Sequence, residues 1–300
     1  MSSSGNLPHL TPVAGRGTVG AVDSYRRDGL TFDVRDGGPP DGEPVVLLHG
    51  FPQDSTAWDK VSPALNEQGL RTLAPDQRGY SPMARPRGRS HYRLRETADD
   101  VLALLDAAGL ESAHVVGHDW GAAVAWALGA WYPDRVRTLT PISVPHPAAM
   151  GRAMVTSDQA LRSYYMGVFQ LPMLPEKLLL AGEGKALRGL LRSGGLPRDA
   201  VDRYVARMRE PGALSSALGW YRAIPWSGRD RVGTVRVPTL HVWSTGDTFL
   251  GRAGAEATER HVQAPYRLEI LEGVSHWIPE VAADRLAELV SAHVRTAWAS

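Results

Sequence analysis

The stretch 114–123 places an aspartate at a position where a strand turns sharply into a helix. Gly117 and Gly121 flank Asp119 two residues away on either side, and such a junction leaves no room for a Cβ at those positions. The central residue of this turn projects its side chain into the cleft above the sheet. A carboxylate there needs no base to attack a strained sp³ carbon, and the attack leaves an alkyl ester on the protein. The alternative is that Asp119 only caps the following helix, where aspartate is a favoured residue.

Two further polar residues follow later strand candidates, in the chain order nucleophile, acid, histidine. Asp247 follows the apolar run 237–243, and His276 follows the run 266–271. Parallel sheets bind ligands beyond the carboxyl ends of their strands, so we expect these side chains to meet Asp119. Asp247 could instead be a turn residue and His276 a packed histidine. Of the ten histidines, however, His276 is the first after the last strand and lies downstream of a strand-end acid.

The composition of the chain limits the kinds of partner and cofactor that it is expected to bind. The 300 residues are 43% hydrophobic and 22% charged, which allows a substantial core. The net charge of +1 favours neither nucleic acid nor a membrane as partner, and no apolar run reaches the length of a membrane span. The chain has no cysteine, so a disulfide framework and a thiolate metal site are excluded, and we expect no cofactor and no metal. Residues 1–20 read as a flexible tail rather than a signal peptide, which predicts a cytoplasmic protein.

Strand and helix candidates alternate along most of the chain, which predicts an α/β fold with a mostly parallel central sheet flanked by helices. The run 44–48 is apolar on both faces, as in a central parallel strand, and Asp28-Gly29 predicts a hairpin. From 145 to 226, helix-like segments separated by Gly and Pro predict an inserted helical lid. The other expected strands are 71–76, 136–144, 237–243 and 266–271, and the expected helices are 58–65, 94–105, 122–131 and 279–298. The core is therefore expected to comprise residues 21–144 and 227–300.

The motifs resemble those of the α/β-hydrolase superfamily over nearly the whole chain after the tail. Within it, the chain is similar to the epoxide hydrolases, whose aspartate nucleophile is shared with the haloalkane dehalogenases. His49-Gly50-Phe51-Pro52 resembles the H-G-x-P oxyanion motif, and His118-Asp119-Trp120-Gly121 resembles the nucleophile motif. Tyr165, ahead of Phe169-Gln170-Leu171-Pro172, resembles the first lid tyrosine, and Tyr221 resembles the second. The adjacent Tyr164 leaves open which residue is the first lid acid.

The resemblance implies an epoxide hydrolase that opens an apolar epoxide to a vicinal diol. Asp119 would form the ester, and His276, oriented by Asp247, would activate the water that hydrolyses it. Tyr165 and Tyr221 would serve the departing oxygen as acids. The backbone N–H groups of Phe51 and Trp120 would form the oxyanion hole, while His49 braces that loop. The expected substrate-binding side chains are Phe51, Trp120, Phe169, Trp220 and Trp277, with Met166, Leu171 and Trp226 as further apolar lid residues. A small apolar epoxide and water are the expected partners, and a homodimer is left open.

Relatives with other activities remain as alternatives. A haloalkane dehalogenase needs two N–H donors for the halide, and Phe51 occupies the usual place of the second donor without supplying one from its ring. Haloacid dehalogenases of the fluoroacetate type carry arginines near the nucleophile, where this chain has Trp120 and Ala123. A non-enzymatic ligand-binding protein on the same fold would tolerate loss of the nucleophile, the tyrosines or the histidine. All of these residues are present, which favours the epoxide hydrolase.

Overall fold

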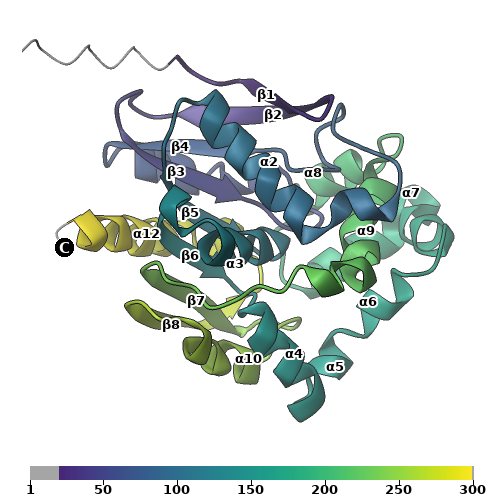
Figure 1. Ribbon diagram of the computed structural model, residues 1–300. Coiled ribbons are helices and arrows are strands. Elements are labelled where there is room, and N and C mark those ends of the chain that lie inside the picture. Colours follow the sequence, from purple (N-terminus) through teal and green to yellow (C-terminus); the bar gives the residue numbers. More distant parts are fainter. Residues whose placement is uncertain (1–19, 299–300) are drawn as a thin grey trace, which may run out of the picture.

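The computed structural model describes residues 20–298, which form a central sheet with helices on both faces and a group of helices at one side (Figure 1). The predicted flexible tail, except Gly20, lies outside the described residues. The sheet has eight strands in the order β1-β2-β4-β3-β5-β6-β7-β8. They are β1 (Ser24–Arg27), β2 (Leu30–Gly37), β3 (Glu43–Leu48), β4 (Leu70–Pro75), β5 (Ala113–His118), β6 (Val136–Ile142), β7 (Thr239–Gly246) and β8 (Tyr266–Ser275).

The sheet is mostly parallel, as predicted. Strand β2 pairs antiparallel with β1 and with β4, and every other neighbouring pair is parallel. The β1–β2 hairpin turns at Asp28 and Gly29, which have φ angles of 51° and 77°. Positive φ at both central residues is what a two-residue turn of matching twist requires. The fold class predicted from the alternation of elements is thus confirmed.

Side chains of the central strand β3 alternate between two apolar layers. Val46 and Leu48 belong to the layer that includes α3 (Trp120–Trp131), whereas Val45 and Leu47 belong to the layer that includes α12 (Ala283–Trp298). Burial on both faces explains why the strand is apolar at successive positions. The other helices of the core are α1 (Val61–Asn66), α2 (Leu94–Ala107), α10 (Arg252–Ala257) and α11 (Ile278–Val281), with 3-10 turns η1 (Ser55–Trp58), η2 (Arg89–Tyr92), η3 (Pro133–Arg135) and η5 (Thr258–His261).

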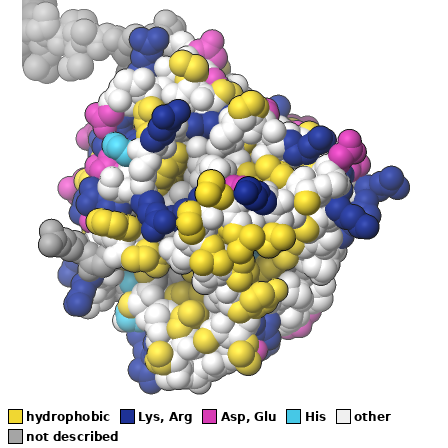
Figure 2. Space-filling model, turned by 90° about the vertical axis from the view of Figure 1, so that its right-hand side faces the viewer, with side chains coloured by type: hydrophobic (Ala, Val, Ile, Leu, Met, Phe, Trp, Pro, Cys, Tyr) yellow, Lys and Arg dark blue, Asp and Glu magenta, His cyan; other side chains and the backbone are white. Residues whose placement is uncertain are grey.

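The helices between β6 and β7 form the segment that we call the lid, residues 145–226. Most of them lie to one side of the sheet, on the right in Figure 1. They are α4 (Pro147–Thr156), α5 (Gln159–Arg162), α6 (Tyr164–Val168), α7 (Leu174–Ser193), α8 (Arg198–Met208) and α9 (Ala213–Ala223), followed by η4 (Ile224–Arg229). Apolar side chains gather on this side of the molecule (Figure 2). Within residues 20–298, no helix is both long and apolar enough to cross a bilayer.

Some element boundaries differ from those expected. Strands β7 and β8 extend to Gly246 and Ser275 because these residues pair with each other across an irregularity in the register. Asp247 and His276 therefore follow their strands directly. The helix expected at 58–65 is divided into η1 and α1, and Asp54 starts η1 by accepting a hydrogen bond from the Thr56 N–H. The helix expected at 279–298 is divided into α11 and α12.

Candidate active site

Asp119 lies between β5 and α3 in a backbone conformation that few non-glycine residues adopt, with φ 51° and ψ −118°. The neighbouring backbones are too close for larger residues. A Cβ added to Gly117 would lie 2.2 Å from the Gly121 carbonyl oxygen, and one added to Gly121 would lie 2.1 Å from the Leu48 carbonyl oxygen. The Asp119 side chain makes no capping hydrogen bond to α3. The helix-capping alternative for this side chain is therefore wrong.

The loop after β3 holds the Asp119 carboxylate. The Phe51 N–H donates to Oδ1 at 2.8 Å, and the adjacent Trp120 N–H also stabilises the negative charge of this carboxylate. A Cβ on Gly50 would lie 2.3 Å from the Asp119 Cβ, so only glycine allows this approach. His49 stabilises the loop: its Nδ1 lies 3.0 Å from the Gly50 carbonyl oxygen, and its Nε2 accepts from the Gln77 N–H at 3.1 Å.

His276 is held in one orientation between two carboxylates. Its Nδ1 lies 2.7 Å from Asp247 Oδ2, and its Nε2 lies 3.8 Å from Asp119 Oδ2. The other Asp247 oxygen accepts from the N–H groups of Phe249 and Leu250 at 2.8 and 2.9 Å. Because Asp247 can only accept when ionised, Nδ1 carries a proton and the Nε2 lone pair of neutral His276 faces Asp119. This is the tautomer that a general base at Nε2 requires.

Burial and neighbouring charges shift the pKa values of Asp119 and His276, which face each other. Burial raises the pKa of Asp119 above its ordinary value, whereas the His276 charge and the N–H groups of Phe51 and Trp120 act in the opposite direction. Burial also lowers the pKa of His276, but the charges and hydrogen bond of its two carboxylate neighbours, chiefly Asp247, raise this pKa overall. The ionised aspartate thus stabilises the protonated histidine, and the histidine stabilises the ionised aspartate.

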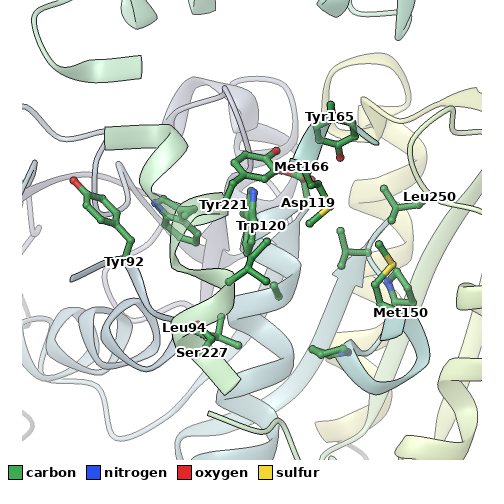
Figure 3. A pocket seen from close by; sticks show the side chains of 16 residues that line it. Tyr92, Leu94, Asp119, Trp120, Met150, Tyr165, Met166, Tyr221, Ser227 and Leu250 are labelled. Atoms are coloured by element: carbon green, nitrogen blue, oxygen red, sulfur yellow. The ribbon is translucent and has the colours of Figure 1, made fainter. Parts of the chain in front are cut away.

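Two tyrosines of the lid face Asp119 across the cavity. The rings of Tyr165 in α6 and Tyr221 in α9 lie 6.0 Å apart between centroids, and Figure 3 shows both hydroxyl groups on the side of Asp119. Burial and the Asp119 charge raise the pKa of Tyr165, and burial and the Tyr165 charge raise that of Tyr221. Both phenols therefore keep their protons at neutral pH. Tyr164, in contrast, is 71% exposed.

Asp119 and the two tyrosines line two cavities of different size. The larger has a volume of about 250 Å³ and an apolar lining from the lid and the core (Figure 3). The smaller has a volume of about 30 Å³ and includes His276. Of the expected substrate-binding residues, Trp120 and Trp220 line the larger cavity, and Phe51, Phe169 and Trp277 line the smaller one.

The expectation for two apolar lid residues is wrong, and several site residues were not expected. Leu171 and Trp226 are 46% and 59% exposed and line neither cavity, whereas Met166 lines the larger one. Leu171 lies between α6 and α7, and Trp226 lies in the 3-10 turn η4, so no helical spacing fixes which way either side chain packs. Unexpected lining residues are Val144, Met150 and Leu250 in the larger cavity and Phe249 and Leu190 in the smaller one. Val144, Phe249 and Leu250 adjoin strand ends, which is the signal that could have identified them.

Known proteins with similar sequences and structures show the family of this chain. The sequence matches the family described as alpha/beta hydrolase fold over residues 43–283. It is 37% identical over 257 residues to AB hydrolase superfamily protein YfhM of Bacillus subtilis, with 84% of this chain and 90% of that protein covered. It is 31% identical over 296 residues to epoxide hydrolase A of Mycobacterium tuberculosis, with 84% and 90% covered.

A solved structure, epoxide hydrolase A from Mycobacterium thermoresistibile, superposes with a TM-score of 0.78 at 26% identity, covering 91% of this chain and 97% of that one. The family match spans most of the chain, and both curated relatives are aligned over most of their length. The chain is therefore a hydrolase that belongs to the alpha/beta hydrolase family and is similar to the epoxide hydrolases within it.

Proposed function

We propose that this protein is an epoxide hydrolase that converts an apolar epoxide into a vicinal diol through an ester on Asp119. The observation that carries this proposal is the position of the Asp119 carboxylate. One of its oxygens is held by the Phe51 N–H, the other faces His276, and two phenols lie across the cavity. The similarity to proteins named epoxide hydrolases supports the same reaction class.

In the first step, a carboxylate oxygen of Asp119 attacks a carbon of the strained ring. The new bond from carbon to the carboxylate oxygen forms as the ring C–O bond breaks, and the departing oxygen takes a proton or a hydrogen bond from Tyr165 and Tyr221. The burial that keeps these phenols protonated makes them available as donors. Two phenols converging on one oxygen also hold the ring in line for attack.

In the second step, water attacks the carbonyl carbon of the ester. His276 Nε2 takes the proton from this water, and Asp247 stabilises the imidazolium that forms. The N–H groups of Phe51 and Trp120 bind the oxyanion. When the oxyanion collapses, the bond between the carbonyl carbon and the diol oxygen breaks, and this oxygen takes a proton from the His276 imidazolium as the diol leaves. The small cavity beside His276, about 30 Å³, has room for the attacking water.

Esterification also makes His276 a more available base. The negative charge of Asp119 contributes to the raised pKa of His276 in the free enzyme, and this charge disappears when the ester forms. The pKa of His276 therefore falls in the intermediate, which favours the neutral imidazole at the step that needs it.

Trapping the ester tests the proposal directly. Because a carboxylate needs no base for the first step, His276→Gln should form the ester from styrene oxide but hydrolyse it slowly. Mass spectrometry of the digested protein should then show the Asp119 peptide heavier by one epoxide. The exposed His91 provides the matched control. The His91→Gln protein should convert styrene oxide to the diol like the wild type and accumulate no adduct. An unmodified Asp119 in His276→Gln with bound substrate would contradict the proposed chemistry.

A halide-releasing enzyme is disfavoured by the contacts of Trp120. Its ring packs edge-on against the Tyr221 ring, with the centroids 5.0 Å apart, so the single indole N–H donor lies beside a phenol. The Phe51 ring offers no second donor. Incubation with 1-bromohexane should therefore release bromide far more slowly than styrene oxide is opened, and the reverse order would favour a dehalogenase.

A further inference from the structure

Besides Asp119 and Asp247, a further buried carboxylate lies near His276, outside the groups that the proposed reaction uses. Glu280, in α11, is four residues after His276 and 6% exposed. Its Oε1 accepts from Gln53 Nε2 at 2.6 Å and from the Tyr204 hydroxyl at 2.8 Å. Its Oε2 is buried and has no partner. An ionised carboxylate with one buried oxygen that has no hydrogen-bond partner is unfavourable.

Glu280 is connected to the catalytic loop through Gln53 and His118. Gln53 Oε1 accepts from the Gly50 N–H at 3.2 Å and lies 2.8 Å from His118 Nδ1. The other ring nitrogen of His118, Nε2, lies 2.8 Å from the carbonyl oxygen of His276. We call these side chains, Glu280, Gln53, His118 and Tyr204, the Glu280 network. It connects lid helix α8 and the loop after β3 to the backbone of the catalytic histidine.

The contacts of His118 fix the number of protons in the Glu280 network. Both ring nitrogens face acceptor oxygens, but a neutral imidazole carries only one N–H. The equally buried His49 has no such conflict, because its two nitrogens face one acceptor and one donor. His118 therefore needs either a second proton or a different partner at Nδ1.

Two arrangements with the same number of protons satisfy these contacts. In the first, His118 is an imidazolium and Glu280 a carboxylate. In the second, the Gln53 amide is turned over, so that its NH₂ donates to neutral His118 and its oxygen accepts from protonated Glu280. Burial favours the second, since it raises the pKa of Glu280 to about 7 and lowers the pKa of His118. The second arrangement gives up the Gly50 hydrogen bond and removes two buried charges.

We propose that the Glu280 network holds one exchangeable proton and positions His276 for hydrolysis of the ester. This inference rests on the proposed function. The carbonyl of His276 is anchored by His118, while its imidazole must reach a water beside Asp119. Loss of the shared proton leaves a negative Glu280, which is among the charges that raise the pKa of His276. Glu280 thereby also stabilises the imidazolium that forms during hydrolysis.

The first step does not depend on the position of His276, because the Asp119 carboxylate attacks without a base. Glu280 should therefore affect the hydrolysis rate and leave the alkylation rate nearly unchanged.

Other charged groups face the Glu280 network and could shift the pH at which it titrates without holding its proton. They are Lys60, whose Nζ donates to the Glu280 carbonyl oxygen at 3.1 Å, together with Asp54, Arg203, His49 and His276.

The wild-type protein provides the first test. In protein with ¹⁵N-labelled histidine and ¹³C-labelled glutamate, the ring nitrogens of His118 and the carboxyl carbon of Glu280 should titrate with one common midpoint. Glu280→Gln and His118→Gln assign the two signals. Independent midpoints, or a His118 signal that does not respond while Glu280 titrates, would overturn the shared proton. This test uses no substrate, so its outcome does not depend on whether an ester forms.

Single-turnover kinetics with styrene oxide provide the second test. The fluorescence of the tryptophans that line the cavity serves as the signal for both steps. Glu280→Gln should slow ester hydrolysis by about tenfold or more and shift its pH profile, while alkylation changes less than about twofold. Glu288→Gln, on the exposed face of α12, should leave both rates unchanged. Equal losses in both steps, or an unchanged hydrolysis rate in Glu280→Gln, would overturn the positioning role. If Glu280→Gln does not fold, Tyr204→Phe removes one donor to the same oxygen and should slow only hydrolysis; an effect on alkylation alone would contradict the proposal.

Discussion

Two carboxylates of the site approach the same histidine and have different roles. Asp119 and Asp247 both approach His276, through Nε2 at 3.8 Å and Nδ1 at 2.7 Å. The Asp247 oxygen that faces away from His276 accepts from the N–H groups of Phe249 and Leu250, which holds this carboxylate in place. Asp119 has a free oxygen and changes its charge during the proposed cycle. The same histidine is therefore paired with a carboxylate in the free enzyme and released from it in the ester.

Removing the Asp119 charge should lower the pKa of His276. The Asp119 carboxylate stabilises the imidazolium, so Asp119→Asn removes one of the contributions that raise this pKa. An NMR titration of ¹⁵N-labelled histidine should show the His276 midpoint at lower pH in Asp119→Asn than in the wild type. Asp158→Asn, an exposed change in the lid, should leave the midpoint in place. An unmoved or raised midpoint in Asp119→Asn would contradict the charge coupling between the two residues.

The two buried tyrosines should share the role of acid. Tyr165→Phe and Tyr221→Phe should each slow alkylation by about tenfold, and the double variant should lose about 10³-fold or more, because either phenol alone still serves the departing oxygen. The exposed Tyr164 provides the matched control, and Tyr164→Phe should react at the wild-type rate. Stopped-flow fluorescence with styrene oxide measures these rates. A wild-type rate in the double variant would exclude the epoxide mechanism.

At the scale of elements, the lid and the strand ends divide the site into two unequal spaces. The larger cavity, about 250 Å³, is lined by α4, α6, α9 and the start of α3. The smaller one, about 30 Å³, is lined by α7 and by the loops that follow β3, β7 and β8. The reacting carboxylate borders both. An epoxide with one large apolar arm therefore fits better than one with a bulky group on each ring carbon.

This asymmetry predicts a substrate preference that can be altered. Phenyl glycidyl ether should show kcat/KM at least about tenfold above that of trans-stilbene oxide. Leu190 in α7 lines the small cavity and is half-buried, so Leu190→Ala should enlarge the space and reduce the difference. Leu178→Ala, at an exposed position of α7 before the break at residues 181–184, is the control. An equal preference in the wild type, or no response to Leu190→Ala, would contradict this division of the site.

Elements could be predicted from the sequence where a local pattern determines them. The strand–turn–helix at Asp119 is such a case, because the turn itself brings Gly117 against Gly121 and leaves no room for a Cβ on Gly117. Gly121 is also required by the close approach of Leu48 in β3, which the local pattern does not show. The ends of β7 and β8 could not be predicted, since their last residues become strand only by pairing with each other. Likewise, the side of a short lid helix that faces the cavity depends on its neighbours, as the exposed Trp226 illustrates.

At the scale of the whole molecule, the site is built by contacts between distant parts of the chain. Gln53 and Glu280 are 227 residues apart in the sequence and form one hydrogen bond. No spacing or periodicity could have predicted that pair, because neither residue lies in a motif whose chemistry requires the other. The nucleophile, acid and histidine could be expected to meet, since the carboxyl ends of parallel strands share one edge of the sheet.

The buried Glu280 should make stability fall as pH rises. Burial raises its pKa from 4.5 to about 7, so the folded protein binds this proton more tightly than the unfolded chain. Its destabilising effect is absent below about pH 4.5 and grows to at most about 3 kcal/mol above pH 7. Urea unfolding of Glu280→Gln should therefore show a smaller loss of unfolding free energy between pH 5 and pH 8 than the wild type. Glu288→Gln should follow the wild type, and equal slopes in all three proteins would contradict the raised pKa.

The fate of one oxygen atom tests the central claim, that Asp119 forms the ester. In a single turnover of styrene oxide in ¹⁸O-labelled water, with enzyme in excess, one carboxylate oxygen of Asp119 passes into the diol. The water oxygen replaces it, because the ester is cleaved at its carbonyl carbon. We expect unlabelled diol in the first turnover and ¹⁸O in the Asp119 peptide. Labelled diol together with an unlabelled Asp119 would show direct attack by water and would contradict the account.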